Sequence, residues 1–120
     1  MASVLIVDDA AFVRMSIKKM LEVHGHVVAG EAADGVEALK KYAELKPELV
    51  ILDITMPQMN GLEVLKRIQV LDSEAKVIVC SSIGQQAIFA QAIELGVKEF
   101  IVKPFQEEQL IAAIEKVVEK

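Results

Sequence analysis

The chain has 120 residues, a hydrophobic fraction of 53% and a formal net charge of −5, which fits one domain with an ample core and leaves little room for a second. It has no basic cluster of the kind that binds nucleic acid, and no apolar run approaches the ~18 residues of a membrane span. The N-terminus lacks the features of a signal peptide, and the single cysteine, Cys80, fits a reducing compartment, so we expect a cytoplasmic protein.

Apolar runs that alternate with amphipathic segments predict five strands and five helices. The expected strands span residues 4–7, 27–30, 49–53, 76–80 and 99–102. The expected helices span residues 11–23, 35–44, 62–71, 85–95 and 107–118. Strands that alternate with helices indicate a parallel, doubly wound α/β sandwich. We expect residues 1–120 to form this one domain, without an output domain.

The third expected strand ends on a carboxylate. Four apolar residues precede Asp53, as in a strand that is covered on both faces of a parallel sheet. Ligands of open parallel sheets bind in the crevice beyond the carboxyl ends of the strands, which places Asp53 at the mouth of that crevice. The alternative is that Asp53 simply ends the strand.

Polar groups also follow the other expected strands. They are Asp8 and Asp9 after the first, Glu31 after the second, Ser81 and Ser82 after the fourth, and Lys103 after the fifth. In a parallel sheet these groups collect at one edge. Three carboxylates this close repel and need a cation, and oxygen ligands on short loops suit Mg²⁺. A cation, an ammonium and a hydroxyl around a carboxylate indicate phosphoryl chemistry, in which the carboxylate can itself accept the phosphoryl group.

Each of these groups also has an ordinary structural explanation. An acidic pair before a helix is often a cap, a Ser-Ser pair often lies in a loop, and a Lys-Pro pair often ends a strand in solvent. Their coincidence at the ends of four strands favours a site. Cys80 lies inside an apolar run, so we expect it to be buried filler rather than a nucleophile.

The same segments resemble the receiver domain of the response regulators, including the single-domain regulators of chemotaxis. The matching segments are residues 4–9 (VLIVDD), 52–61 (LDITMPQMNG), 81–82 (SS) and 103–105 (KPF). They extend over the chain with the separations typical of that family. The resemblance implies a flavodoxin-like (βα)5 fold whose parallel sheet has the strand order 2-1-3-4-5.

The resemblance implies a role for each residue of the acidic edge. Asp53 would be the phosphoacceptor. Asp8 and Asp9 would hold Mg²⁺, Asp9 directly and Asp8 through water. Asp53 and the backbone carbonyl of Thr55 would be further ligands of the metal. Lys103 would contact the phosphoryl oxygens.

The resemblance also implies a pair of switch residues. Ser81 would hydrogen-bond the new phosphoryl group, and Phe100 would turn inward as Ser81 moves. Many chemotaxis regulators carry Tyr at this aromatic position, and Phe offers no hydroxyl to a partner. The Lys103-Pro104 peptide bond would be cis. Asn60 replaces an Asp that is more frequent in the family, which we expect to matter little.

The expected helix over residues 85–95 is unusually apolar, and Glu94 is its only charged residue. Its apolar side chains, which cover a wide arc, are Ile88, Phe89, Ala92, Ile93 and Leu95. The pattern alone favours a broad stripe that faces the core. The alternative is an apolar docking surface. The resemblance favours docking, because receivers commonly signal through the fourth helix, the fifth strand and the fifth helix.

The function implied by the resemblance is a stand-alone phosphorylation switch of chemotaxis. Such a protein is not an ordinary enzyme, although it takes part in its own phosphorylation and dephosphorylation. A sensor histidine kinase would be the donor, the flagellar motor switch the target, and a dedicated phosphatase a further candidate partner; neither nucleic acid nor a membrane is expected as a partner.

A phosphorelay intermediate is an alternative. A haloacid-dehalogenase-like phosphatase is a weaker alternative, because that family has an Asp where Thr55 stands and usually a longer chain. The chain also has no G-x-G-x-x-G and no P-loop to cradle a nucleotide.

Overall fold

Runs of Val, Ile and Leu form five strands of one sheet, as these side chains do where both faces of a sheet are covered. The computed structural model describes residues 2–54, 61–82 and 86–118. Its strands are β1 (Ser3–Val7), β2 (Val27–Ala32), β3 (Leu49–Asp53), β4 (Val77–Ser82) and β5 (Glu99–Lys103). All the pairings are parallel and the strand order is β2-β1-β3-β4-β5. The expected doubly wound, flavodoxin-like α/β fold is confirmed.

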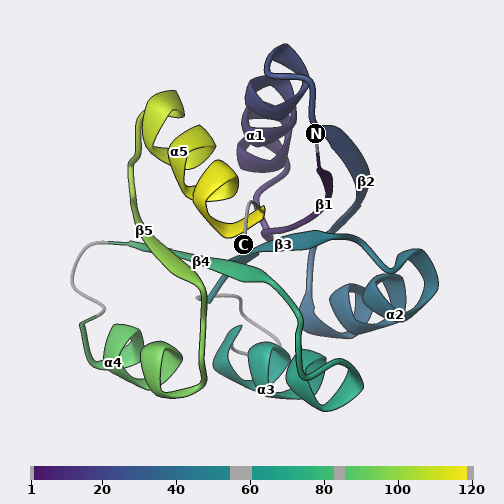
Figure 1. Cartoon of the computed structure of the whole chain (residues 1–120), viewed down its shortest axis with the longest axis vertical. Helices are drawn as coiled ribbons and strands as arrows, with labels where there is room; N and C mark the ends of the chain where they lie inside the picture. Colours follow the sequence, from purple (N-terminus) through teal and green to yellow (C-terminus); the bar gives the residue numbers. More distant parts are fainter. Residues whose placement is uncertain (1, 55–60, 83–85, 119–120) are drawn as a thin grey trace.

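Helices cover both faces of this sheet. They are α1 (Ala11–Val23), α2 (Gly35–Leu45), α3 (Gly61–Leu71), α4 (Gln86–Glu94) and α5 (Glu107–Val118). Figure 1 shows α1 and α5 on one face and α2, α3 and α4 on the other. Alternate side chains of a strand point to opposite faces, so Ile51 packs with Ile17 of α1 and Ile114 of α5, whereas Leu52 packs with Leu65 of α3. None of the described helices is long and apolar enough to cross a membrane.

Three strands run further at their C-terminal ends than the sequence predicts. β2 includes Glu31 and Ala32, because Ala32 still pairs with Val7 of β1. β4 and β5 also extend into polar residues, and Ser82 pairs with Lys103. Apart from Ala32, the residues added at these ends are polar, so apolar patterning does not indicate them, but their backbone groups still complete the hydrogen-bond ladder. The extensions bring the polar strand ends into fixed register.

The end of α2 differs from the expectation for a residue before proline. A residue before proline usually has extended backbone angles. Lys46, which precedes Pro47, instead has left-handed backbone angles (φ 47°, ψ 56°), and its N–H donates to the Tyr42 carbonyl at 3.0 Å. α2 therefore ends with a left-handed cap, which satisfies one of its last carbonyls.

α4 is not the core helix that the sequence pattern favours. Of the expected apolar stripe, only Ala92 is buried, whereas Ile88 and Leu95 are partly buried against the core and Ile93 is 56% exposed. The reason is the position of the helix. α4 packs beside β5, which is the last strand of the sheet, and the described residues form no further strand beneath the outer side of the helix.

α3 begins against the end of β3. A Cβ atom at Gly61 would lie 2.1 Å from Cα of Ile54, and the Gly61 N–H donates to the Ile54 carbonyl at 3.1 Å. Only glycine permits so close an approach of two backbones. Gly61 therefore brings the first residue of α3 against the residue that follows Asp53.

Candidate functional site

The carboxyl ends of β1, β3, β4 and β5 meet at one edge of the sheet. The strands are in register there, since Asp53 of β3 pairs with Cys80 of β4, and Ser82 of β4 pairs with Lys103 of β5. The predicted site residues at these ends are Asp8, Asp9, Asp53, Ser81 and Lys103. Residues from four distant parts of the chain are thus neighbours, as the sequence predicts.

Three carboxylates form the centre of the site. One side-chain oxygen from each of Asp8, Asp9 and Asp53 lies within 4.8 Å of the other two. Asp8 and Asp53 are only 2% and 4% exposed, whereas Asp9 is open to solvent. Like charges repel strongly where water is largely excluded. The ionised cluster therefore needs positive charge nearby.

Lys103 supplies part of this charge. Its Nζ donates to Oδ2 of Asp8 at 2.6 Å and to Oδ2 of Asp53 at 3.3 Å. Burial by itself would lower the pKa of Lys103. The hydrogen bond to Asp8 and the charges of both carboxylates outweigh burial, so the pKa is raised above its usual value. The ammonium is therefore charged at neutral pH.

The remaining charge suits a divalent cation. Three carboxylates with one ammonium leave two formal negative charges. All three acidic donors are oxygen atoms, and Asp9 faces solvent, which fits the preference of Mg²⁺ for oxygen ligands and its retention of several waters. Asp8, Asp9 and Asp53 can therefore hold a metal ion. The predicted carbonyl ligand, Thr55, lies outside the described residues, as does Asn60.

Two residues that were not predicted as site residues are linked to the acidic cluster, Arg14 directly and Glu31 through Arg14. Arg14 of α1 donates from Nη1 to the backbone carbonyl of Asp8 at 2.6 Å, and from Nε to Oε1 of Glu31 at 3.0 Å. The sequence signal for Glu31 was its place at the end of the second strand. Arg14 belongs to no motif, and its only signal is its place in the first turns of the helix after the acidic pair.

The two predicted switch residues lie on neighbouring strands. Ser81 of β4 is fully buried, and its hydroxyl donates to the Ser82 carbonyl at 3.4 Å, which is a long hydrogen bond. Phe100 of β5 is partly buried and stacks on Phe89 of α4, with ring centroids 3.9 Å apart and an interplanar angle of 6°. The Ser81 hydroxyl is thus weakly held, and Phe100 links β5 to α4.

Two predictions for residues beside the site are confirmed. Cys80 is buried, and this burial raises the pKa of its thiol to about 12, so the residue is packing material rather than a nucleophile. The Lys103-Pro104 peptide bond is cis, as the resemblance implies.

Comparison with known proteins gives the family. A model of the response regulator receiver domain matches residues 4–115. The chain belongs to the response-regulator receiver family. The receiver is 55% identical to chemotaxis protein CheY of Thermotoga maritima over 114 residues, which are 95% of each chain. It is 50% identical to CheY of Bacillus subtilis over 113 residues, 94% of each chain. The protein is therefore a CheY-like receiver domain.

A solved structure has the same arrangement. A chain in the crystal structure of the CheX–CheY–BeF3–Mg²⁺ complex from Borrelia burgdorferi matches this receiver with a TM-score of 0.93 and 35% identity. The match covers 98% of this chain and 90% of that one. The two chains thus share the same overall fold.

Proposed function

We propose that this receiver is a chemotaxis response regulator that accepts a phosphoryl group on Asp53. The observation that carries the proposal is the meeting of three carboxylates and an ammonium at one edge of the sheet. Asp53 lies within 4.8 Å of Asp8 and Asp9 by its side-chain oxygen, and 3.3 Å from Nζ of Lys103. A nucleophilic carboxylate beside a cation site and a charged donor suits phosphoryl transfer.

In the proposed reaction an Oδ atom of Asp53 attacks the phosphorus of a phosphohistidine. The new O–P bond forms as the P–N bond breaks, and the imidazole nitrogen keeps the electron pair. Lys103 would donate hydrogen bonds to the phosphoryl oxygens, since its Nζ already lies beside Asp53. Attack by water on the same phosphorus would later release inorganic phosphate and restore the carboxylate.

Asp8, Asp9 and Asp53 would hold Mg²⁺, with the Thr55 carbonyl as a further ligand. The bound ion would neutralise charge on the phosphoryl oxygens. The oxygen donors and the excess of negative over positive charge among Asp8, Asp9, Asp53 and Lys103 support this proposal. The presence of Mg²⁺ in the complex of CheY from B. burgdorferi supports it independently.

Ser81 and Phe100 would transmit the change. The Ser81 hydroxyl has a long bond to a neutral carbonyl, and an anionic phosphoryl oxygen on Asp53 would be a stronger acceptor. Movement of Ser81 towards that oxygen would favour an inward Phe100, at the expense of its stack on Phe89. Phosphorylation would then shift the population between two arrangements of β5 and α4.

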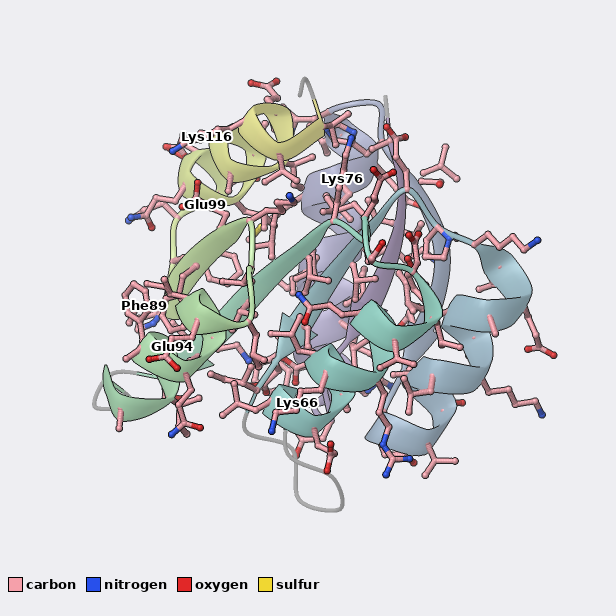
Figure 2. The ribbon with its side chains drawn as sticks, turned by 60° about the horizontal axis from the view of Figure 1, so that its bottom comes forward. Lys66, Lys76, Phe89, Glu94, Glu99 and Lys116 are labelled. Atoms are coloured by element: carbon pink, nitrogen blue, oxygen red, sulfur yellow. The ribbon has the colours of Figure 1, made fainter. Side chains whose placement is uncertain are left out.

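The surface of α4, β5 and α5 would bind the target. Figure 2 shows Phe89 and Glu94 on α4, and Glu99 of β5 near Lys116 of α5. Glu99 and Lys116 form an ion pair at 3.3 Å, and Ile93 is exposed on α4. Exposed apolar side chains beside paired charges suit a protein partner.

The similarity to CheY proteins supports a cytoplasmic signalling role, with a sensor histidine kinase as the donor and the flagellar motor switch as the target. A dedicated phosphatase would be a further partner. A phosphorelay intermediate would use the same site and differs only in the acceptor that follows, so a phosphotransfer assay with purified partners distinguishes the two.

Acetyl phosphate provides the direct test of Asp53. Incubation with acetyl phosphate and Mg²⁺ should add about 80 Da, the mass of one phosphoryl group, in an adduct that is labile in alkali. Asp53→Asn should abolish the adduct, because the amide cannot act as the nucleophile, and a chelator should prevent it. Intact-protein mass spectrometry measures both effects.

Asp72→Asn is the matched control, since Asp72 is an exposed aspartate that directly follows the last residue of α3, and this variant should be labelled like the wild type. Equal labelling of the Asp53→Asn variant would overturn the assignment of the phosphoacceptor. Turnover of an added phosphomonoester would favour the phosphatase instead.

A further inference from the structure

Four hydrogen bonds hold Asp8, which lies in the loop that carries the acidic pair. The Asp8 N–H donates to the Ala32 carbonyl at 3.0 Å, and its Oδ1 accepts from the Ala10 N–H at 2.9 Å. Its Oδ2 accepts from Lys103. Its backbone carbonyl accepts from Nη1 of Arg14 at 2.6 Å. Both backbone groups and both carboxylate oxygens of Asp8 are thus fixed.

Arg14 connects this loop to β2. Its side chain is 17% exposed, and its guanidinium also donates from Nε to Oε1 of Glu31 at 3.0 Å. The backbone carbonyl of Glu31 accepts in turn from Nζ of Lys41 on α2. One planar guanidinium therefore joins the carbonyl after β1 to a carboxylate at the end of β2, and the two donors lie in a fixed geometry.

We propose that Arg14, held by Glu31, is a positioning residue that sets the affinity of the acidic cluster for a divalent cation. The inference rests on the proposed function, since it concerns the same metal site. By fixing the Asp8 carbonyl, Arg14 fixes the peptide between Asp8 and Asp9 and so the direction in which both carboxylates leave the backbone. Groups that orient metal ligands commonly change the metal affinity on the order of tenfold or more when they are removed.

If Arg14 acted only through its charge, it would lower the affinity for the divalent cation. A guanidinium near a cation site repels the cation by Coulomb's law, so its removal would tighten binding if Arg14 acted only through its charge. A positioning role predicts weaker binding. A contribution to stability alone predicts no change in the affinity of the folded protein. The sign of the change in affinity therefore separates the three explanations.

The test is a Mg²⁺ titration followed by the backbone amide NMR signals of Asp8 and Asp9, at a temperature at which each variant is folded. Arg14→Ala should raise the dissociation constant on the order of tenfold. Arg14→Lys keeps the charge and most of the packing but cannot donate to both acceptors in the same geometry, so it should also weaken binding. Arg67→Ala is the control, because Arg67 is exposed on α3 and its loss changes the net charge equally; its dissociation constant should equal that of the wild type.

Glu31→Gln tests whether Glu31 acts through Arg14. This substitution should weaken Mg²⁺ binding when Arg14 is present and have no further effect in the Arg14→Ala background, since coupled residues are not additive. Additive effects would indicate that Glu31 acts through its own charge. Unchanged or tighter binding by both Arg14 variants, with a wild type that binds Mg²⁺, would overturn the inference and leave the proposed function intact. A wild type that binds no Mg²⁺ would overturn both.

Discussion

Among single residues, Lys103 and His26 respond to their surroundings in opposite ways. Burial would lower the pKa of Lys103, but the contacts with Asp8 and Asp53 outweigh it, so the ammonium keeps its charge near neutral pH. His26 is buried, and the charges of Glu115 and Glu48 do not outweigh the effect of this burial on its pKa. Its Nδ1 accepts a hydrogen bond from the Ala2 N–H at 3.1 Å. That bond requires an unprotonated Nδ1 and therefore a neutral ring.

We predict that His26 makes the stability depend on pH. Burial lowers the pKa of His26 in the folded state below its ordinary value of 6.5. The unfolded chain then binds the proton more readily, so the contribution is full above about pH 6.5 and is lost as the pH falls through the folded pKa. His26→Asn keeps an acceptor for Ala2 but does not titrate, so its unfolding free energy should fall less on acidification. Urea unfolding at about pH 7.5 and about pH 5.5 measures the unfolding free energy of each protein. An equal fall in that free energy between the two pH values for both proteins would show that His26 protonation is not linked to folding.

Among the elements, α4 has the least support from the core. Ala92 is its one buried residue of the described apolar set, and the stack of Phe89 on Phe100 holds its outer side. At the C-terminal end, Nε2 of Gln69 on α3 donates to the Leu95 carbonyl, one of the last carbonyls of the segment. A side chain from a neighbouring helix thus caps α4 in place of an intrahelical partner.

Loss of this cap should loosen α4 locally. Gln69→Leu has a similar size but no donor, and the net loss of such a hydrogen bond is about 1 kcal/mol. Opening of the end of α4 should therefore become roughly fivefold more frequent, and the Gly96 and Val97 amides should exchange with solvent faster by that factor. Amide exchange followed by NMR measures this, with amides of α1 as internal reference.

Gln91→Leu provides the comparison for the cap, since Gln91 is an exposed glutamine on α4 itself. Its exchange pattern should match the wild type. If Gln69→Leu leaves the exchange of Gly96 and Val97 unchanged, the end of α4 is held by packing rather than by the side chain of Gln69.

Across the whole molecule, the sequence predicts best those strands that are covered by helices on both faces of the sheet. β3 is covered on both faces and reads as an unbroken apolar run that ends at Asp53. The site was predictable for the same reason, because each polar group follows such a run. The strand order and the proposed roles of Ser81 and Phe100 came from the family resemblance, since apolar periodicity does not say which strands are neighbours.

Two of the predictions that failed concern the edges of the sheet. β2 is an edge strand and continues into Glu31, where backbone pairing and not apolarity determines its end. α4 lies beside β5, the opposite edge, so its apolar stripe is wider than the surface available to bury it. Arg14 was missed because its partners, the Asp8 carbonyl and Glu31, come together only in the folded chain.

The acidic cluster should make the stability of the whole domain depend on Mg²⁺. A ligand that binds only the folded state, at ten times its dissociation constant, stabilises it by about 1.4 kcal/mol. For a domain of this size that is a rise of roughly 4–8 °C in melting temperature. Asp9→Asn removes one ligand and should abolish most of this rise, which calorimetry with Mg²⁺ and with a chelator measures.

Without metal, the Asp9→Asn substitution should change the melting temperature in the other direction. Removing one of three neighbouring carboxylates relieves repulsion that Lys103 only partly offsets, so Asp9→Asn should melt above the wild type in a chelator. Glu22→Gln removes one charge from an exposed site on α1 and should retain the full response to Mg²⁺. An equal rise for the Asp9→Asn variant and the wild type would show that the ion binds elsewhere. A lower melting temperature for that variant in a chelator would show that Asp9 stabilises the fold by contacts that outweigh the repulsion within the cluster.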